Sequence, residues 1–131
     1  MLTLFTIPKA FQGHTGIIQR NAIKSWTLLD PGCQVILVGD DDGTDKAAEE
    51  LNVRHISDVK RNEFGTPLLN HSFQLAEAEA AFPLICHVNA DIILMSDFIE
   101  AVQRVKGQKF GGIWELTFRT KKHGIVIDRN L

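Results

Sequence analysis

The chain has 131 residues, of which 44% are hydrophobic, and this fits one compact domain that buries roughly two-thirds of its unfolded surface. Lys and Arg total 14 against 16 Asp and Glu, and no long block of either charge occurs. A nucleic acid or an anionic membrane surface is therefore not expected as a partner.

The cysteines and the length of the apolar runs suggest a reduced protein without a membrane span. Cys33 and Cys86 lie in apolar stretches, where isolated thiols usually behave as small hydrophobic residues. No apolar stretch approaches the ~20 residues needed to span a bilayer, and no basic signal-peptide start follows Met1. We therefore expect a cytoplasmic protein.

In the first half of the chain, short apolar runs alternate with segments of helical period. The predicted elements are a strand at 2 to 7, a helix at 16 to 29, a strand at 34 to 39, a helix at 44 to 51 and a strand at 53 to 56. Pro8 ends the first strand because it lacks a backbone donor. Thr15 and Thr44 are placed to cap the two helices.

The second half continues the alternation. A loop leads to Thr66 and Pro67, which suit an N-cap and the first position of a helix. The buried stripe expected for that helix is Leu69, Phe73, Ala76 and Ala80. The remaining predicted elements are a strand at 84 to 88, a helix from Ser96 to Gly107 with Phe98, Val102 and Val105 facing inward, and an alternating strand at 110 to 118.

This pattern predicts an α/β fold with three layers, in which helices cover both faces of a mostly parallel, Rossmann-like sheet. No repeat or linker divides the chain, so residues 1 to 131 are expected to form a single domain.

Polar residues follow three of the predicted strands. Lys9 follows the first, Asp40, Asp41 and Asp42 the second, and Asn89 and Asp91 the fourth. Ligands of open α/β sheets bind outside the carboxyl ends of the strands. Asn89 and Asp91 are two positions apart, so on an extended segment an amide and a carboxylate oxygen face one site. Such oxygens suit Mg²⁺ or Mn²⁺, although turn and capping roles explain the same residues.

Four stretches in order, "IPKAFQGHTGIIQRNAIKSW", "VILVGDDDGT", "NEFGTPLLNHSFQLAE" and "HVNADIIL", resemble the amino-terminal half of a GT-A-type glycosyltransferase, close to the family-2-like group. The resemblance covers about residues 2 to 106. It implies a metal-dependent nucleotide-diphosphate-sugar site, in which Asp40 or Asp41 contacts the nucleoside and Asp91 holds Mn²⁺ or Mg²⁺.

The resemblance also has departures. Asn89 stands where the family's Asp-x-Asp motif has its first Asp, which keeps an oxygen donor but removes a negative charge. We expect the donor site to include Pro8, Lys9, Asp40, Asp41, Gly65, Thr66 and Asn89, with Gly65 and Thr66 near a helix end that faces phosphate. The carboxyl-terminal side looks truncated, because an acceptor-binding half is missing from the resemblance.

Two functions remain open. The first is a glycosyltransferase-like protein of low activity, and the second is a non-catalytic module that binds a nucleotide or oligomerises. The candidates for a catalytic general base are Glu115, His123 and Asp128. The evidence for each is weak, because an ordinary strand-face or turn position explains the same residue. The apolar residues of 110 to 118 suggest a surface for a homodimer.

Overall fold

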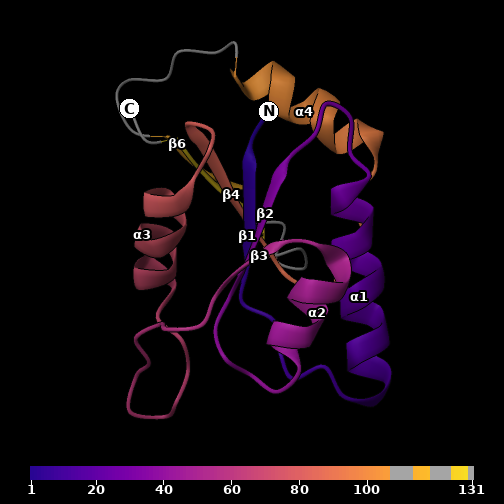
Figure 1. The fold of residues 1–131 in the computed structure, drawn as a ribbon. Helices are drawn as coiled ribbons and strands as arrows, with labels where there is room; N and C mark the ends of the chain where they lie inside the picture. The colour runs from indigo at the N-terminus through magenta and orange to yellow at the C-terminus, as the bar shows by residue number, and fades with distance from the viewer. Residues whose placement is uncertain (107–113, 119–124, 130–131) are drawn as a thin grey trace.

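The computed structural model describes residues 1–106, 114–118 and 125–129, and these form one sheet with helices packed against it (Figure 1). The strands are β1 (Thr3–Thr6), β2 (Gln34–Val38), β3 (Arg54–Ile56), β4 (Leu84–Val88), β5 (Trp114–Phe118) and β6 (Ile125–Arg129). The helices are α1 (Gly13–Thr27), α2 (Thr44–Leu51), α3 (Leu69–Glu79) and α4 (Ser96–Lys106).

The strand order across the sheet is β3-β2-β1-β4-β6-β5. The first four of these strands are parallel, while β6 pairs antiparallel with β4 and with β5. In β1, Phe5 lies between Ile36 of β2 and His87 of β4. The predicted α/β class with a mostly parallel sheet is therefore confirmed.

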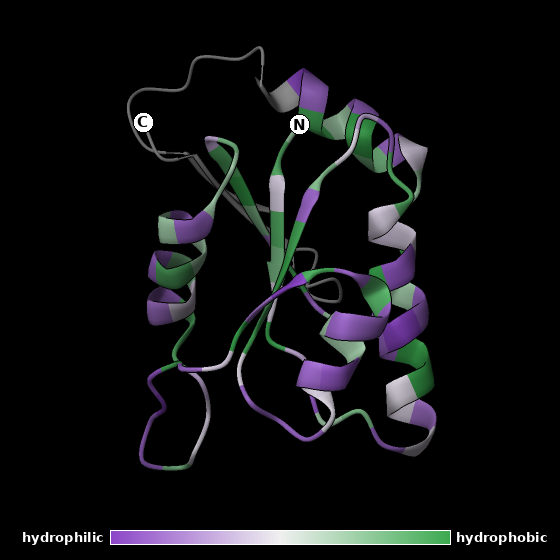
Figure 2. Cartoon of the chain, in the orientation of Figure 1, coloured by the Kyte–Doolittle hydropathy of each residue, from purple (hydrophilic) through white to green (hydrophobic). Residues whose placement is uncertain are grey.

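Side chains alternate between the two faces of the sheet, and each face carries its own apolar cluster. Leu4 of β1 belongs to the cluster under α1, α2 and α4, which also contains the fully buried Trp26. Phe5, the next residue, belongs to the cluster under α3. Figure 2 shows apolar strands at the centre and polar residues on the outer surfaces of the helices, so the molecule has the three layers expected.

Two of the predicted helix starts are wrong, and a third helix, α2, begins at Thr44 as predicted but has a different N-cap residue. α1 begins at Gly13, so Thr15 lies inside its first turn and is not the cap. Gly43, with φ of 83°, is the N-cap residue of α2, and the Thr44 hydroxyl donates to the Asp41 carbonyl at 2.7 Å. Gly43 suits this position because a left-handed φ strains any residue with a Cβ.

The second wrong start is that of α3, which begins at Leu69 and not after a cap at Thr66. Pro67 instead pairs with Arg61 in an isolated antiparallel bridge. Leu69 is consequently 42% exposed, although a buried position was predicted for it, whereas Ala76 is buried as expected. The hairpin before the helix uses the residues that the sequence pattern assigns to the first helical turn.

Some predictions fall outside the described residues. The predicted helix end at Gly107 and residues 110 to 113 of the alternating strand are among these. Within the described part, no helix is long and apolar enough to cross a membrane. Both cysteines are free, and burial raises the pKa of the Cys86 thiol strongly, which keeps it neutral.

Candidate functional site

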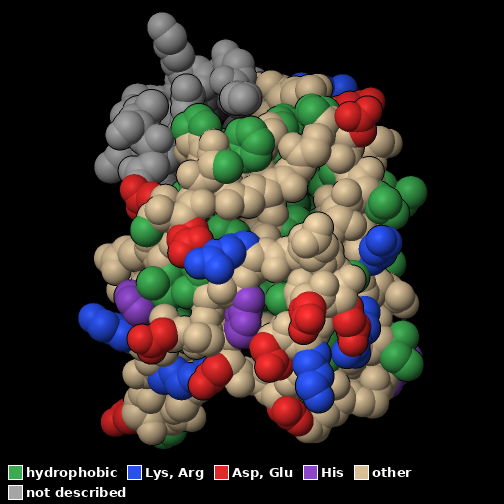
Figure 3. Space-filling model, in the orientation of Figure 1, with side chains coloured by type: hydrophobic (Ala, Val, Ile, Leu, Met, Phe, Trp, Pro, Cys, Tyr) green, Lys and Arg blue, Asp and Glu red, His purple; other side chains and the backbone are tan. Residues whose placement is uncertain are grey.

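The carboxyl ends of β1, β2 and β4 meet at one edge of the sheet, the lower edge in Figure 1. The strand order reverses there, because β2 lies on one side of β1 and β4 on the other. Such a reversal leaves a crevice between the loops, which is where open α/β sheets bind ligands. Figure 3 shows charged and histidine side chains gathered on the lower half of the molecule, toward this edge.

A cleft of about 310 Å³ opens at this edge between the ends of β1 and β4 and the first turns of α1. Its polar lining comes from Lys9, Thr15, Gln19, Asn89 and Asp91. Lys9, Asn89 and Asp91 were predicted to share a site and they do line one cleft. Pro8 is buried beside Lys9 and does not line it.

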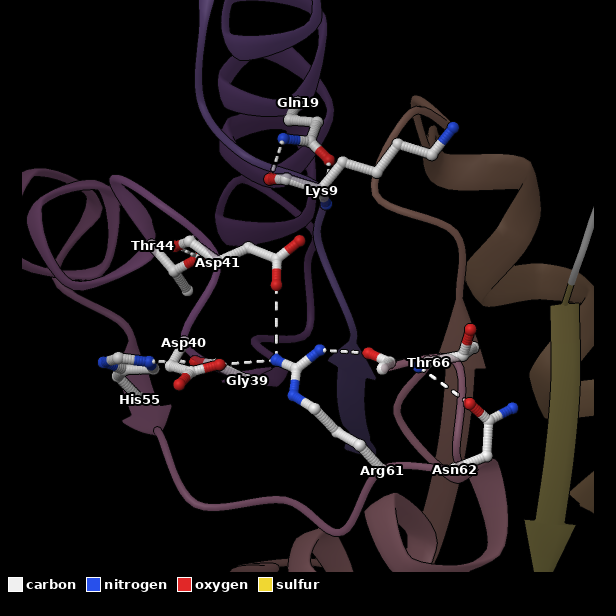
Figure 4. Close-up of polar contacts among 11 residues, drawn as sticks. Lys9, Gln19, Gly39, Asp40, Asp41, Thr44, His55, Arg61, Asn62 and Thr66 are labelled. Carbon is white, nitrogen blue, oxygen red and sulfur yellow. Dashed lines mark hydrogen bonds and ion pairs between the residues drawn. The ribbon is translucent and has the colours of Figure 1, made fainter.

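Gln19 of α1 fixes the backbone of Lys9. The Lys9 amide donates to Gln19 Oε1 at 2.8 Å, and Gln19 Nε2 donates to the Lys9 carbonyl at 2.9 Å (Figure 4). The Gln19 residue is only 3% exposed, and these bonds engage both ends of its amide. Because both backbone groups of Lys9 are engaged, the ammonium is the part of Lys9 that remains for a ligand.

The same helix holds the opposite wall of the cleft. Trp26 Nε1 donates to the Ile92 carbonyl at 2.8 Å, and the Leu94 amide donates to Ser25 Oγ at 3.0 Å. A turn closed by the Ile92 amide on the Asn89 carbonyl, at 3.2 Å, connects this anchor to the cleft residues. α1 therefore fixes the segments that carry Lys9 on one side and Asn89 and Asp91 on the other.

The predicted acidic residues after β2 are ion-paired. Arg61 Nη2 donates to Asp40 Oδ1 at 2.5 Å and to Asp41 Oδ1 at 3.3 Å, and Nη1 donates to the Gly65 carbonyl at 2.8 Å (Figure 4). Desolvation lowers the pKa of Arg61, but the hydrogen bonds and charges of both carboxylates outweigh it and raise that pKa. Asp40 nevertheless keeps 67% of its side chain exposed.

The loop that carries Arg61 is braced by Asn62. Asn62 Oδ1 accepts the amides of Phe64 at 2.9 Å and Thr66 at 3.0 Å, and the Asn62 carbonyl accepts the Gly65 amide at 3.0 Å. Gly65 has φ of 79°, which only glycine adopts without strain. The amides of Gly65 and Thr66 are thus bound within the loop, and the helix end expected beside them is wrong because α3 starts later.

Two contributors were missed by the sequence analysis, Arg61 and Gln19. Arg61 lies in a polar loop without a motif, and Gln19 is a polar residue on a helix, where such residues usually face solvent. No local sequence pattern marks either residue as part of the site, because each acts through a partner at least ten residues away in the chain.

The fold resembles that of a crystal structure from Desulfovibrio desulfuricans G20, a provisionally assigned nucleotide-diphospho-sugar transferase. The superposition has a TM-score of 0.59 at 11% sequence identity and covers 98% of this chain. The chain spans 63% of the length of that protein. At this identity the likeness shows the fold alone. No family model matches the chain, and no curated protein matches its sequence.

A divalent cation would find few ligands here. Asn89 and Asp91 offer one amide and one carboxylate oxygen set at the cleft, and among the described residues no group of three His, Cys, Asp or Glu side chains is placed to hold a metal. Mg²⁺ commonly uses one or two carboxylates and completes its shell with water and substrate phosphate. Within the described residues, Asn89 and Asp91 would therefore need a phosphorylated ligand beside them to hold such a cation.

Proposed function

We propose that this chain binds a nucleotide-diphosphate sugar in the Lys9–Asp91 cleft, in the manner of a GT-A-type glycosyltransferase. The observation that carries the proposal is the convergence of Lys9, Asn89 and Asp91 on one cleft where the strand order reverses. The fold shared with the nucleotide-diphospho-sugar transferase of D. desulfuricans supports it.

Within the proposal, the diphosphate lies over the cleft and the nucleoside extends toward the end of β2. Asp40 retains enough exposure to accept a hydroxyl or base N–H while Arg61 holds one of its oxygens. Asn89 and Asp91 would hold Mn²⁺ or Mg²⁺ together with the diphosphate. The cation would offset the charge of the leaving diphosphate.

Calorimetry with UDP and GDP, each with and without Mn²⁺, tests the site. We expect Mn²⁺ to tighten nucleoside diphosphate binding and Asp91→Asn to remove that gain. Asp58→Asn, which removes an exposed carboxylate from the β3–α3 loop, is the matched control and should leave binding unchanged. If neither nucleotide binds under any condition, the proposed site is wrong.

Turnover separates an enzyme from the alternative, a non-catalytic nucleotide-binding or oligomerising module. Transfer needs an acceptor hydroxyl aligned with the anomeric carbon, and alignment alone commonly contributes about 7 to 11 kcal/mol. We expect at most slow hydrolysis of UDP- and GDP-sugars, followed as release of the nucleoside diphosphate. Rapid, acceptor-dependent release that Asp91→Ala abolishes would contradict this and establish a transferase.

A homodimer remains a separate proposal. Among the described strands, β5 ends the order and pairs on one side with β6, so its other edge would offer backbone groups to a second strand. Sedimentation at several concentrations, with Trp114→Glu as the probe, checks it. A monomer at high concentration would rule out this interface.

A further inference from the structure

The two cations at the carboxyl edge, Lys9 and Arg61, differ in what binds them. Arg61 already contacts two carboxylates and a carbonyl. Lys9 is exposed, and among the described residues no carboxylate oxygen lies within 4.0 Å of its ammonium. Figure 4 shows the Lys9 side chain pointing away from Asp41 and Arg61. An incoming anion therefore meets an uncommitted positive charge at Lys9.

We propose that the Lys9 ammonium is the primary anchor of the diphosphate, so that a nucleoside diphosphate binds this cleft even without a divalent cation. The inference rests on the proposed function and adds to it which group carries the phosphate charge. Gln19 already fixes the Lys9 backbone, so binding at the ammonium has to order the side chain but not the backbone.

The two charges of the cleft predict how the Asp91 charge affects diphosphate affinity with and without a divalent cation. Lys9 and Asp91 are the charged residues of the lining, and their formal charges cancel. Without a cation, Asp91 repels the diphosphate while Lys9 attracts it. With a cation, Asp91 becomes a ligand and its charge is favourable. The effect of removing the Asp91 charge should therefore reverse between the two conditions.

The experiment measures UDP and GDP dissociation constants by calorimetry in EDTA and in Mn²⁺. In EDTA, Lys9→Met should weaken binding about tenfold or more, as expected for loss of one charge-assisted contact. Lys9→Arg should retain most of the affinity, because it keeps the charge. Lys24→Met, which removes an exposed lysine near the end of α1, is the control and should bind as wild type.

Asp91→Asn provides the sign test. It should strengthen nucleotide binding in EDTA and weaken it in Mn²⁺. Uridine and guanosine, which lack the diphosphate, should bind wild type and Lys9→Met equally. Circular dichroism melting of each variant checks that the fold is retained.

The outcomes separate the two proposals. Binding only in Mn²⁺, or binding in EDTA that Lys9→Met leaves unchanged, overturns the role of Lys9 and leaves the nucleotide site standing. No binding of either nucleotide in both conditions overturns the site itself.

Discussion

Two groups of charged residues share one edge of the sheet but differ in how far their charges are already neutralised. After β2, Asp40 and Asp41 are held by Arg61, which also ties down its own loop. Between β1 and β4, Lys9 and Asp91 face a cleft, and α1 holds the backbone on both sides. The first group stabilises the structure at this edge, whereas the second keeps its charges available to a ligand.

The largest expected effect tests the scaffold of the cleft through His87, which lies on β4 two residues before Asn89. Its ring packs 5.1 Å from Phe5 and 6.4 Å from Phe73, measured between ring centroids, and burial lowers its pKa from 6.5 to about 4. The unfolded chain takes up this proton near pH 6.5, but the folded chain only near pH 4. The contribution of neutral His87 to the free energy of unfolding is therefore complete above pH 6.5 and is lost as the pH drops toward 4.

The loss from His87 protonation should reach up to about 3 kcal/mol over that interval. Urea unfolding of wild type and His87→Leu between pH 4 and 7 measures it. The wild type should show the steeper decline, because the leucine variant has no proton to take up at this position. Equal slopes would contradict the role of His87.

Trp26→Phe tests the shared anchor of the cleft. It leaves the Ile92 carbonyl without its donor and removes part of a fully buried ring, so unfolding free energy should fall by about 2 kcal/mol. Hydrogen exchange at Leu94 should accelerate more than exchange in β2, which has no contact with this anchor through hydrogen bonds. Uniform acceleration would mean that Trp26 contributes only global stability.

Arg61→Met and Lys9→Met sharpen the comparison most directly. Arg61→Met should lower stability by about 1 kcal/mol or less, because its carboxylate partners keep 67% and 41% of their side chains exposed, and should raise exchange at Thr66 and Leu68. Lys9→Met should leave both quantities unchanged, since its ammonium has no carboxylate partner in the described structure. Thermal melting and hydrogen exchange of the two variants give the test.

The sequence predicts the positions of the strands better than it predicts the loops at the carboxyl edge of the sheet. The strands at 34 to 38 and 84 to 88 are apolar runs with one polar residue each, Gln34 and His87, and their apolar character was enough to locate them. The start of α3 could not be found in this way, because Thr66 and Pro67 suit a helix start equally well. What decides is a local hairpin, in which Pro67 pairs with Arg61 and the Thr66 amide donates to Asn62 Oδ1.

The candidate site shows the same division. Asn89 and Asp91 line one cleft as predicted, but the reason differs, because they lie in the turn after β4 and not on an extended segment; the parallel sheet adds Lys9. The neutralisation of Asp40 and Asp41 depends on Arg61, 20 or more positions along the chain, and no local pattern marks that contact. Gln19 is likewise a buried residue that its sequence neighbours do not distinguish.

The central place of β1 has a consequence for how the molecule folds. β1 pairs early in the chain with β2, but its other neighbour, β4, comes only after β3 and α3 have been made, and long loops close slowly. Until then one edge of β1 displays unpaired backbone groups beside apolar side chains, an arrangement that invites association with other chains. The arrival of β4 closes that edge and creates the cleft in the same step, so conditions that delay β4 should cost both solubility and ligand binding.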